Sequence, residues 1–251
     1  IWINLDREVD VARFLTALCA DMRVPVPNNV ILHVGTTFSM GRYPTTVLNA
    51  NPRGFVLCLS LPLLSVLTVN ELRTIVAHEL AHFGGGDLKY KRRVVPVYTA
   101  INETIRIMCL IDRDRRKGYF AHLFLQIPLF ILCLFGRRFK QLDLSLAREQ
   151  ESRADAFSAA VCGRESFVSA LRKSTGYGIA FDKVLEQLMD EHRKSKQPLS
   201  TAYRTFRKRL KEYQPIAQEA LTTEMVEYSD IWDQHPSMIK RIEAIPPYPE
   251  R

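Results

Sequence analysis

Apolar residues at the start of the chain recur first at helical spacing and then in short β-branched runs. From Asp6 to Met22 the helical spacing predicts an amphipathic helix. Three β-branched stretches follow, separated by glycine and proline: Val30–Val34, Thr45–Leu48 and Gly54–Leu67. These stretches predict a small sheet.

The remainder of the chain, from Thr68 onward, has a helical pattern. Breaks are expected at Gly84–Gly86, near Gly118, Gly136 and Gly163, and near Pro198. A small N-terminal sheet followed by many helices predicts an α+β fold, mostly helical.

One segment, Tyr119–Phe135, is almost wholly apolar and has basic clusters on both sides. Its length of about 17 residues is at the lower limit for a membrane-spanning helix. Two interpretations remain open. The segment spans, enters or lies on an anionic bilayer, or it is a buried core helix with solvated ends.

Composition narrows the class of protein without identifying it. The 251 residues are 47% hydrophobic and 25% charged, with 11 Gly and 13 Pro, which excludes collagen, low-complexity disorder and small disulfide scaffolds; the net charge is +8. We expect a single domain over residues 1–251 with a helical, partly apolar insertion at about 88–140. Five widely spaced cysteines without a CxxC motif favour free thiols in a reducing compartment.

Positive charge favours an anionic partner, either nucleic acid or lipid headgroups. The most basic stretch, Arg204–Lys211, has Phe206 and Leu210 interleaved with its charges, so a solvated amphipathic helix is the preferred interpretation. No nucleic-acid-binding motif accompanies it, and we expect no specific nucleic-acid partner.

The strongest chemical signal lies in Val69–Phe83, with sequence VNELRTIVAHELAHF. Thr68 and Glu71 have the spacing of a capping box, which predicts the start of a helix. On that helix His78 and His82 lie one turn apart on the same side and can bind one divalent ion. Glu79 is placed to remove a proton from a water held by that ion. This is the HExxH pattern.

A tetrahedral zinc site needs a third protein ligand and one open position. Candidates after His82 are His122, His192, His235 and the acidic residues. Glu151 and Asp155 share one stripe of a predicted helix with Arg148, so Glu151 is a candidate ligand. Asp155 is then a candidate acceptor that fixes the tautomer of a ligand imidazole.

Three motifs in order, HELAHFGGGD, REQESRADAF and HPSMIKRI, resemble those of the HtpX and CAAX prenyl protease families. These are gluzincin metallopeptidases, and the resemblance covers most of Val30–Ile242. It implies a zincin-like fold with one zinc ion on His78, His82 and Glu151, with Glu79 as general base. It further implies that Asp155 supports the first histidine and that His235 lies near the cleft, where it stabilises the oxyanion.

The resemblance also implies how a substrate is bound. In zincins an edge strand next to the metal helix pairs with an extended polypeptide. We expect the strand within Gly54–Leu67 to be that edge strand, since it directly precedes the metal helix. Pro62 within it fits an edge position.

The function expected from these features is zinc-dependent endopeptidase activity. Zinc lowers the pKa of its water to about 7, and Glu79 takes the proton and later delivers it to the leaving amine. The resemblance implies association with a membrane, an active site on the cytoplasmic side, and misfolded or membrane proteins as substrates. Two alternatives remain: a metal-stabilised scaffold or chaperone-like binding module, and a basic membrane- or RNA-binding protein with an accidental HExxH.

Overall fold

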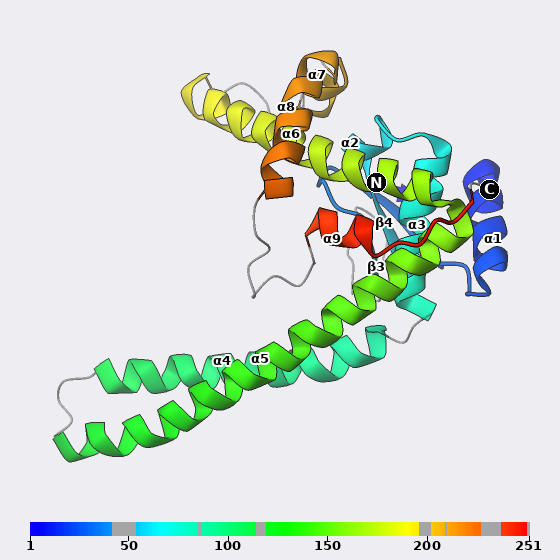
Figure 1. Cartoon of the computed structure of the whole chain (residues 1–251). Helices are drawn as coiled ribbons and strands as arrows, with labels where there is room; N and C mark the ends of the chain where they lie inside the picture. Colours follow the sequence, from blue (N-terminus) through cyan, green and yellow to red (C-terminus); the bar gives the residue numbers. More distant parts are fainter. Residues whose placement is uncertain are drawn as a thin grey trace.

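The computed structural model describes residues 1–41, 54–84, 87–113, 119–195, 202–208, 210–226 and 237–249. The strands are β1 (Trp2–Ile3), β2 (Asn29–His33), β3 (Ser39–Gly41) and β4 (Val56–Ser60). The helices are α1 (Val9–Met22), α2 (Leu61–Leu64), α3 (Val69–Gly84), α4 (Asp87–Arg113), α5 (Tyr119–Cys162), α6 (Arg164–Ser195), α7 (Ala202–Lys208), α8 (Leu210–Val226) and α9 (Met238–Glu243). A small N-terminal sheet followed by helices confirms the α+β expectation (Figure 1).

The described strands form one sheet in the order β1-β2-β4-β3. β2 and β4 are parallel, and β1 and β3 pair with them in the antiparallel sense. β4, the last strand before the HExxH helix α3, is therefore an inner strand, and the expectation that it forms the edge is wrong. β3 holds that edge in the described sheet. Pro62 lies outside the strand, near the start of α2.

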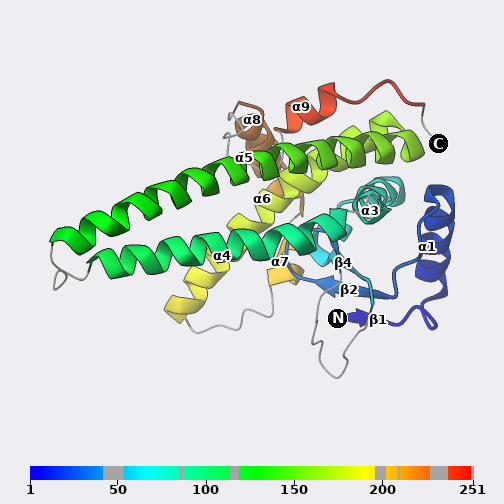
Figure 2. The ribbon, with the colours of Figure 1, turned by 90° about the horizontal axis from the view of Figure 1, so that it is seen from below.

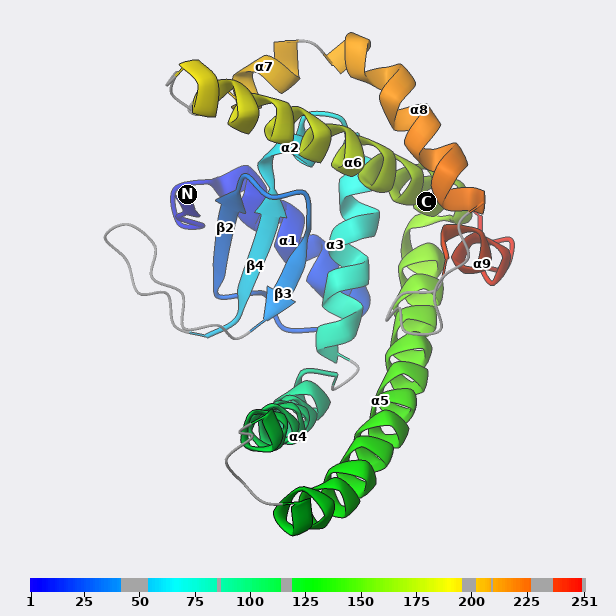
Figure 3. The ribbon, with the colours of Figure 1, turned by 90° about the vertical axis from the view of Figure 1, so that its left-hand side faces the viewer.

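The main core joins one face of the sheet to α1 and α3. Leu18 of α1, Leu57 of β4 and Leu80 of α3 are each 1% exposed or less and belong to one apolar cluster. Figure 3 shows α1 behind the sheet and α3 between the sheet and α5. The stretch Thr45–Leu48, which was expected to be a strand, lies outside the described residues.

Two long helices, α4 and α5, lie side by side and project away from the sheet as an arm (Figures 1 and 2). The expected break at Gly136 does not occur, because α5 continues through it. Gly136 instead allows close helix packing, since a Cβ there would lie 3.2 Å from Cγ2 of Ile101 on α4. The break at Gly163 is confirmed, and its φ of 98° separates α5 from α6.

The apolar segment Tyr119–Phe135 forms the outer part of α5. Within the described ranges, no helix combines the length and the apolar character needed to cross a bilayer.

The basic stretch Arg204–Lys211 falls on α7 and the start of α8. Phe206 is fully buried and its ring packs against Phe181 of α6, with centroids 5.0 Å apart. Arg204 and Arg207 are exposed. The stretch is thus amphipathic, as expected, and its apolar side closes a second core.

Candidate active site

The helix that carries the HExxH pattern, α3, begins at a capping box. The backbone N–H of Thr68 donates to Glu71 Oε2 at 2.7 Å, and the Glu71 N–H donates to Thr68 Oγ1 at 3.3 Å. Glu71 also accepts hydrogen bonds from Ser169 at 2.5 Å and Lys173 at 2.9 Å, both on α6. Glu71 therefore determines where α3 begins and also holds the start of α3 against α6.

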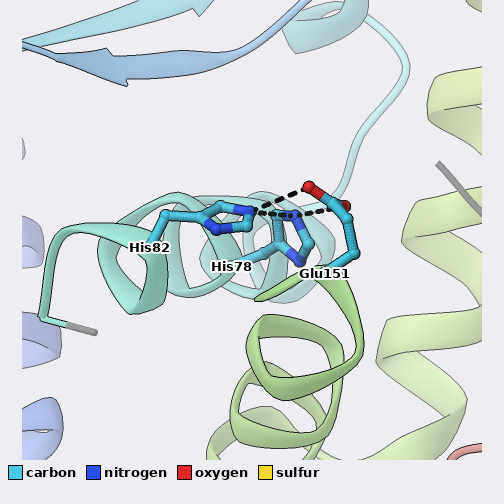
Figure 4. A group of neighbouring side chains, drawn as sticks. All are labelled: His78, His82 and Glu151. Carbon is cyan, nitrogen blue, oxygen red and sulfur yellow. Dashed lines mark hydrogen bonds and ion pairs between the residues drawn. The ribbon is translucent and has the colours of Figure 1, made fainter. Parts of the chain in front are cut away.

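Three predicted ligand residues meet where α3 packs against α5. The Nε2 atoms of His78 and His82 are 3.2 Å apart. Glu151, from α5, places Oε1 3.2 Å from His82 Nε2 and Oε2 3.6 Å from His78 Nε2. Figure 4 shows the two rings and the carboxylate pointing toward one another. These atoms offer one shared binding point for a cation.

The spacing of these ligand atoms fits zinc. Tetrahedral zinc with bonds of about 2.0–2.1 Å places its ligand atoms about 3.3 Å apart. The observed separations of 3.2 to 3.6 Å match that value. Two imidazoles and one carboxylate are also the donor set of catalytic zinc sites that keep one position open.

Behind the first histidine lies a chain of polar contacts. Asp155 Oδ1 is 2.9 Å from His78 Nδ1. The guanidinium of Arg241, on α9, donates to both oxygens of Asp155, at 2.8 and 2.7 Å. Asp155 is 1% exposed. With its Nδ1 edge against this carboxylate, the His78 ring directs Nε2 at His82 and Glu151, as metal ligation requires.

The electrostatics of the site favour a cation. Burial alone would lower the pKa of His78, but hydrogen bonds with Asp155 and Glu151 and the charge of Glu79 raise it to about 9. Burial would raise the pKa of Asp155, yet Arg241 and His78 hold it below its usual value. The carboxylates of Glu151 and Asp155 and the charge of Glu79 thus favour positive charge at His78, and a divalent ion can take the place of a proton there.

A cavity of about 280 Å³ opens beside this cluster. Glu79 and His78 line it from α3, and Thr37 and Phe38 line it from the chain just before β3. Its apolar wall comes from Leu63, Ile75, Phe167 and Leu171. Glu79 and the candidate ligand His78 thus line the same open cavity.

The structure places His78, His82, Glu79, Glu151 and Asp155, all named as candidates from the sequence, in one region between α3 and α5. His235 lies outside the described residues. Arg241 was not singled out from the sequence, although it belongs to the same HPSMIKRI motif. No periodic signal marks it, because its role depends on where the short helix α9 packs.

Comparisons with known proteins agree with this geometry. The sequence model of Peptidase family M48 matches residues 39–247. A protease HtpX homolog of Neisseria meningitidis is 28% identical over 130 residues, which cover 51% of this chain and 46% of that protein. Protease HtpX of Glaesserella parasuis is 24% identical over 156 residues, covering 60% of this chain and 53% of the relative. The chain spans about half the length of these curated relatives. No solved structure matches it significantly.

Proposed function

The chain belongs to peptidase family M48, and on this premise we propose that it is a zinc-dependent endopeptidase with Glu79 as general base. The convergence of His78, His82 and Glu151 beside Glu79 is the observation that carries the proposal. An ion that served structure alone would need no carboxylate facing an open cavity. This feature favours an enzyme over the metal-stabilised scaffold.

His78, His82 and Glu151 would hold the ion, which supplies a Lewis acid that polarises the scissile carbonyl. Glu79 takes a proton from the attacking water and then gives it to the leaving nitrogen. Asp155 keeps the proton of His78 on Nδ1, at the 2.9 Å contact. The apolar wall of the cavity receives a substrate side chain and excludes water from it.

The substrate in this proposal is a polypeptide bound in extended form along β3. β3 is an edge of the described sheet, and the residues just before it line the cavity with Glu79. Main-chain hydrogen bonds to such an edge give affinity with little sequence selectivity. That property suits misfolded proteins as substrates.

The test is hydrolysis of casein, with zinc content measured on the same samples. We expect about one zinc per chain in the parent protein. Glu79→Gln should retain the zinc and lose hydrolysis by about 100- to 10,000-fold, because only the proton-transfer group is removed. Glu186→Gln, which changes an exposed carboxylate on α6, is the matched control. Equal cleavage by Glu79→Gln and the parent would refute the mechanism.

We further propose that the arm contacts a membrane surface. Six apolar side chains of α5 are 49 to 76% exposed, and we call them the arm surface: Phe124, Ile127, Phe130, Ile131, Leu134 and Phe135. Exposed Arg137 and Arg138 follow them, and α5 carries no Asp or Glu before Asp143. An apolar helix face beside positive charge suits the interface of an anionic bilayer.

We also propose that the active site lies on the cytoplasmic side of that membrane. The supporting feature is the set of five cysteines, all of which are free thiols. Free thiols persist in reducing compartments.

A further inference from the structure

The C-terminal segment, residues 237–249, is anchored to the junction of α5 and α6. Arg164, at the start of α6, donates to the carbonyl oxygens of Ile245 and Ile242 at 3.3 and 3.4 Å. Ile245 is 5% exposed and packs in a cluster with Ala159 and Phe167. These contacts hold the segment in place without touching the candidate metal site.

A separate contact leads from this segment into the site. The Arg241 side chain is 15% exposed, and its planar guanidinium donates to both oxygens of Asp155. Its Nη2 atom also lies 3.9 Å from Oε2 of Glu151. A charge buried to this extent is costly unless it is paired, and here its partners are the carboxylates of the site.

The ion pair between Arg241 and Asp155 determines the orientation of the Asp155 carboxylate toward His78. One oxygen of Asp155, Oδ1, accepts from Arg241 at 2.7 Å and lies 2.9 Å from His78 Nδ1. Two parallel hydrogen bonds from a rigid fork fix the plane of a carboxylate, which a single contact does not do. With Arg241 removed, Asp155 would be free to rotate away from the imidazole.

We propose that Arg241 is a positioning residue for the metal site: through Asp155 it orients the His78 imidazole, so that the C-terminal helix α9 contributes to metal affinity. This inference rests on the metal site of the proposed function. It concerns the binding of the ion and not the hydrolysis.

Arg241 and Arg164 allow a matched test, because both help to hold the C-terminal segment against the rest of the protein but only Arg241 contacts Asp155. Arg241→Gln removes the fork on Asp155, whereas Arg164→Gln loosens the segment without touching Asp155. We would measure zinc affinity by competition with a chromophoric chelator, and thermal unfolding in EDTA. Removal of a group that supports a metal ligand weakens metal binding by about 10- to 100-fold. We expect such a loss for Arg241→Gln and less than about a twofold change for Arg164→Gln.

Other results would overturn the proposal. Unchanged or tighter zinc binding by Arg241→Gln would show that the arginine does not position the site. Equal weakening by both variants would show that it only anchors the segment. If Arg241→Gln does not fold, Arg241→Lys and Arg164→Lys make the same comparison, because lysine cannot supply the planar fork. Failure of the parent to bind zinc would instead refute the proposed function.

Discussion

Nε2 of His82 lies 3.2 Å from Oε1 of Glu151, although α4 and the outer part of α5 separate the two residues along the chain. The contact forms because α3 and α5 pack together at the base of the arm. Small residues at this base, including Ala81 and Ala154, line a cavity shared by the two helices. The site therefore depends on helix packing as much as on ligand identity.

The proposed role of Glu151 as third metal ligand gives the first prediction. Glu151→Ala should lower zinc affinity more than about 100-fold, because two imidazoles alone leave the coordination incomplete. Elemental analysis after dialysis would then show far less than one zinc per chain. Glu149→Ala changes an exposed carboxylate on the same helix and should leave the zinc content unaltered. Full zinc occupancy in Glu151→Ala would exclude this residue as a ligand.

The buried carboxylate of Glu71 predicts acid sensitivity. Burial alone would raise its pKa, but hydrogen bonds from Lys173, Ser169 and Thr68 lower it from 4.5 to about 2. Because the folded pKa is the lower one, the stabilisation is fully present above pH 4.5 and is lost as pH falls toward about 2. Glu71→Gln should lower the free energy of unfolding by about 1–3 kcal/mol at pH 7.

Urea denaturation in EDTA from pH 7 to 2.5 measures this effect without metal. The difference between Glu71→Gln and the parent should stay constant down to about pH 4.5 and shrink below it. Glu103→Gln breaks an exposed pair with Arg106 on α4 and should leave the urea midpoint nearly unchanged. A difference that stayed constant over the whole range would contradict the assignment to Glu71.

The arm surface predicts binding to anionic vesicles. Replacing Phe124, Ile131 and Phe135 together by serine should weaken co-sedimentation with phosphatidylglycerol vesicles by more than about 10-fold, because three apolar side chains no longer enter the interface. Neutral phosphatidylcholine vesicles should bind the parent more weakly and with little salt dependence.

The control for the arm is a pair of exposed valines elsewhere. Val9 and Val34 are 57% and 63% exposed, and their replacement by serine should not affect vesicle binding. Equal binding by the arm variant and the parent would rule out the arm as the membrane contact.

Replacing two glycines of α6 by alanine is expected to change the free energy of unfolding in opposite directions. At Gly176 a Cβ would lie 2.8 Å from the carbonyl oxygen of Ala217 on α8, whereas at Gly178 the nearest atom is Thr36 Cβ at 3.7 Å. Gly178→Ala should raise the free energy of unfolding by up to about 1 kcal/mol, since alanine favours a helix. Gly176→Ala should lower it by about 1–3 kcal/mol through overpacking. Thermal unfolding of both variants tests the pair, and equal shifts would disprove close packing at Gly176.

Local features of this protein follow from the sequence because they depend on residues close together in the chain. The capping box at Thr68 and Glu71, the helix that carries His78 and His82, and the break at Gly163 each involve contacts within a few residues. Helical geometry alone then brings the two imidazoles to one side.

Only the tertiary structure decided the features that depend on packing. β4 became an inner strand because β3 paired with its far side, and α5 continued through Gly136 because α4 lies against it. Glu151 reached the histidines through the packing of α5 on α3, and Arg241 reached Asp155 from a segment at the far end of the chain. Periodicity describes which face of an element is buried, whereas the partner of that face is set by contacts between residues far apart in sequence.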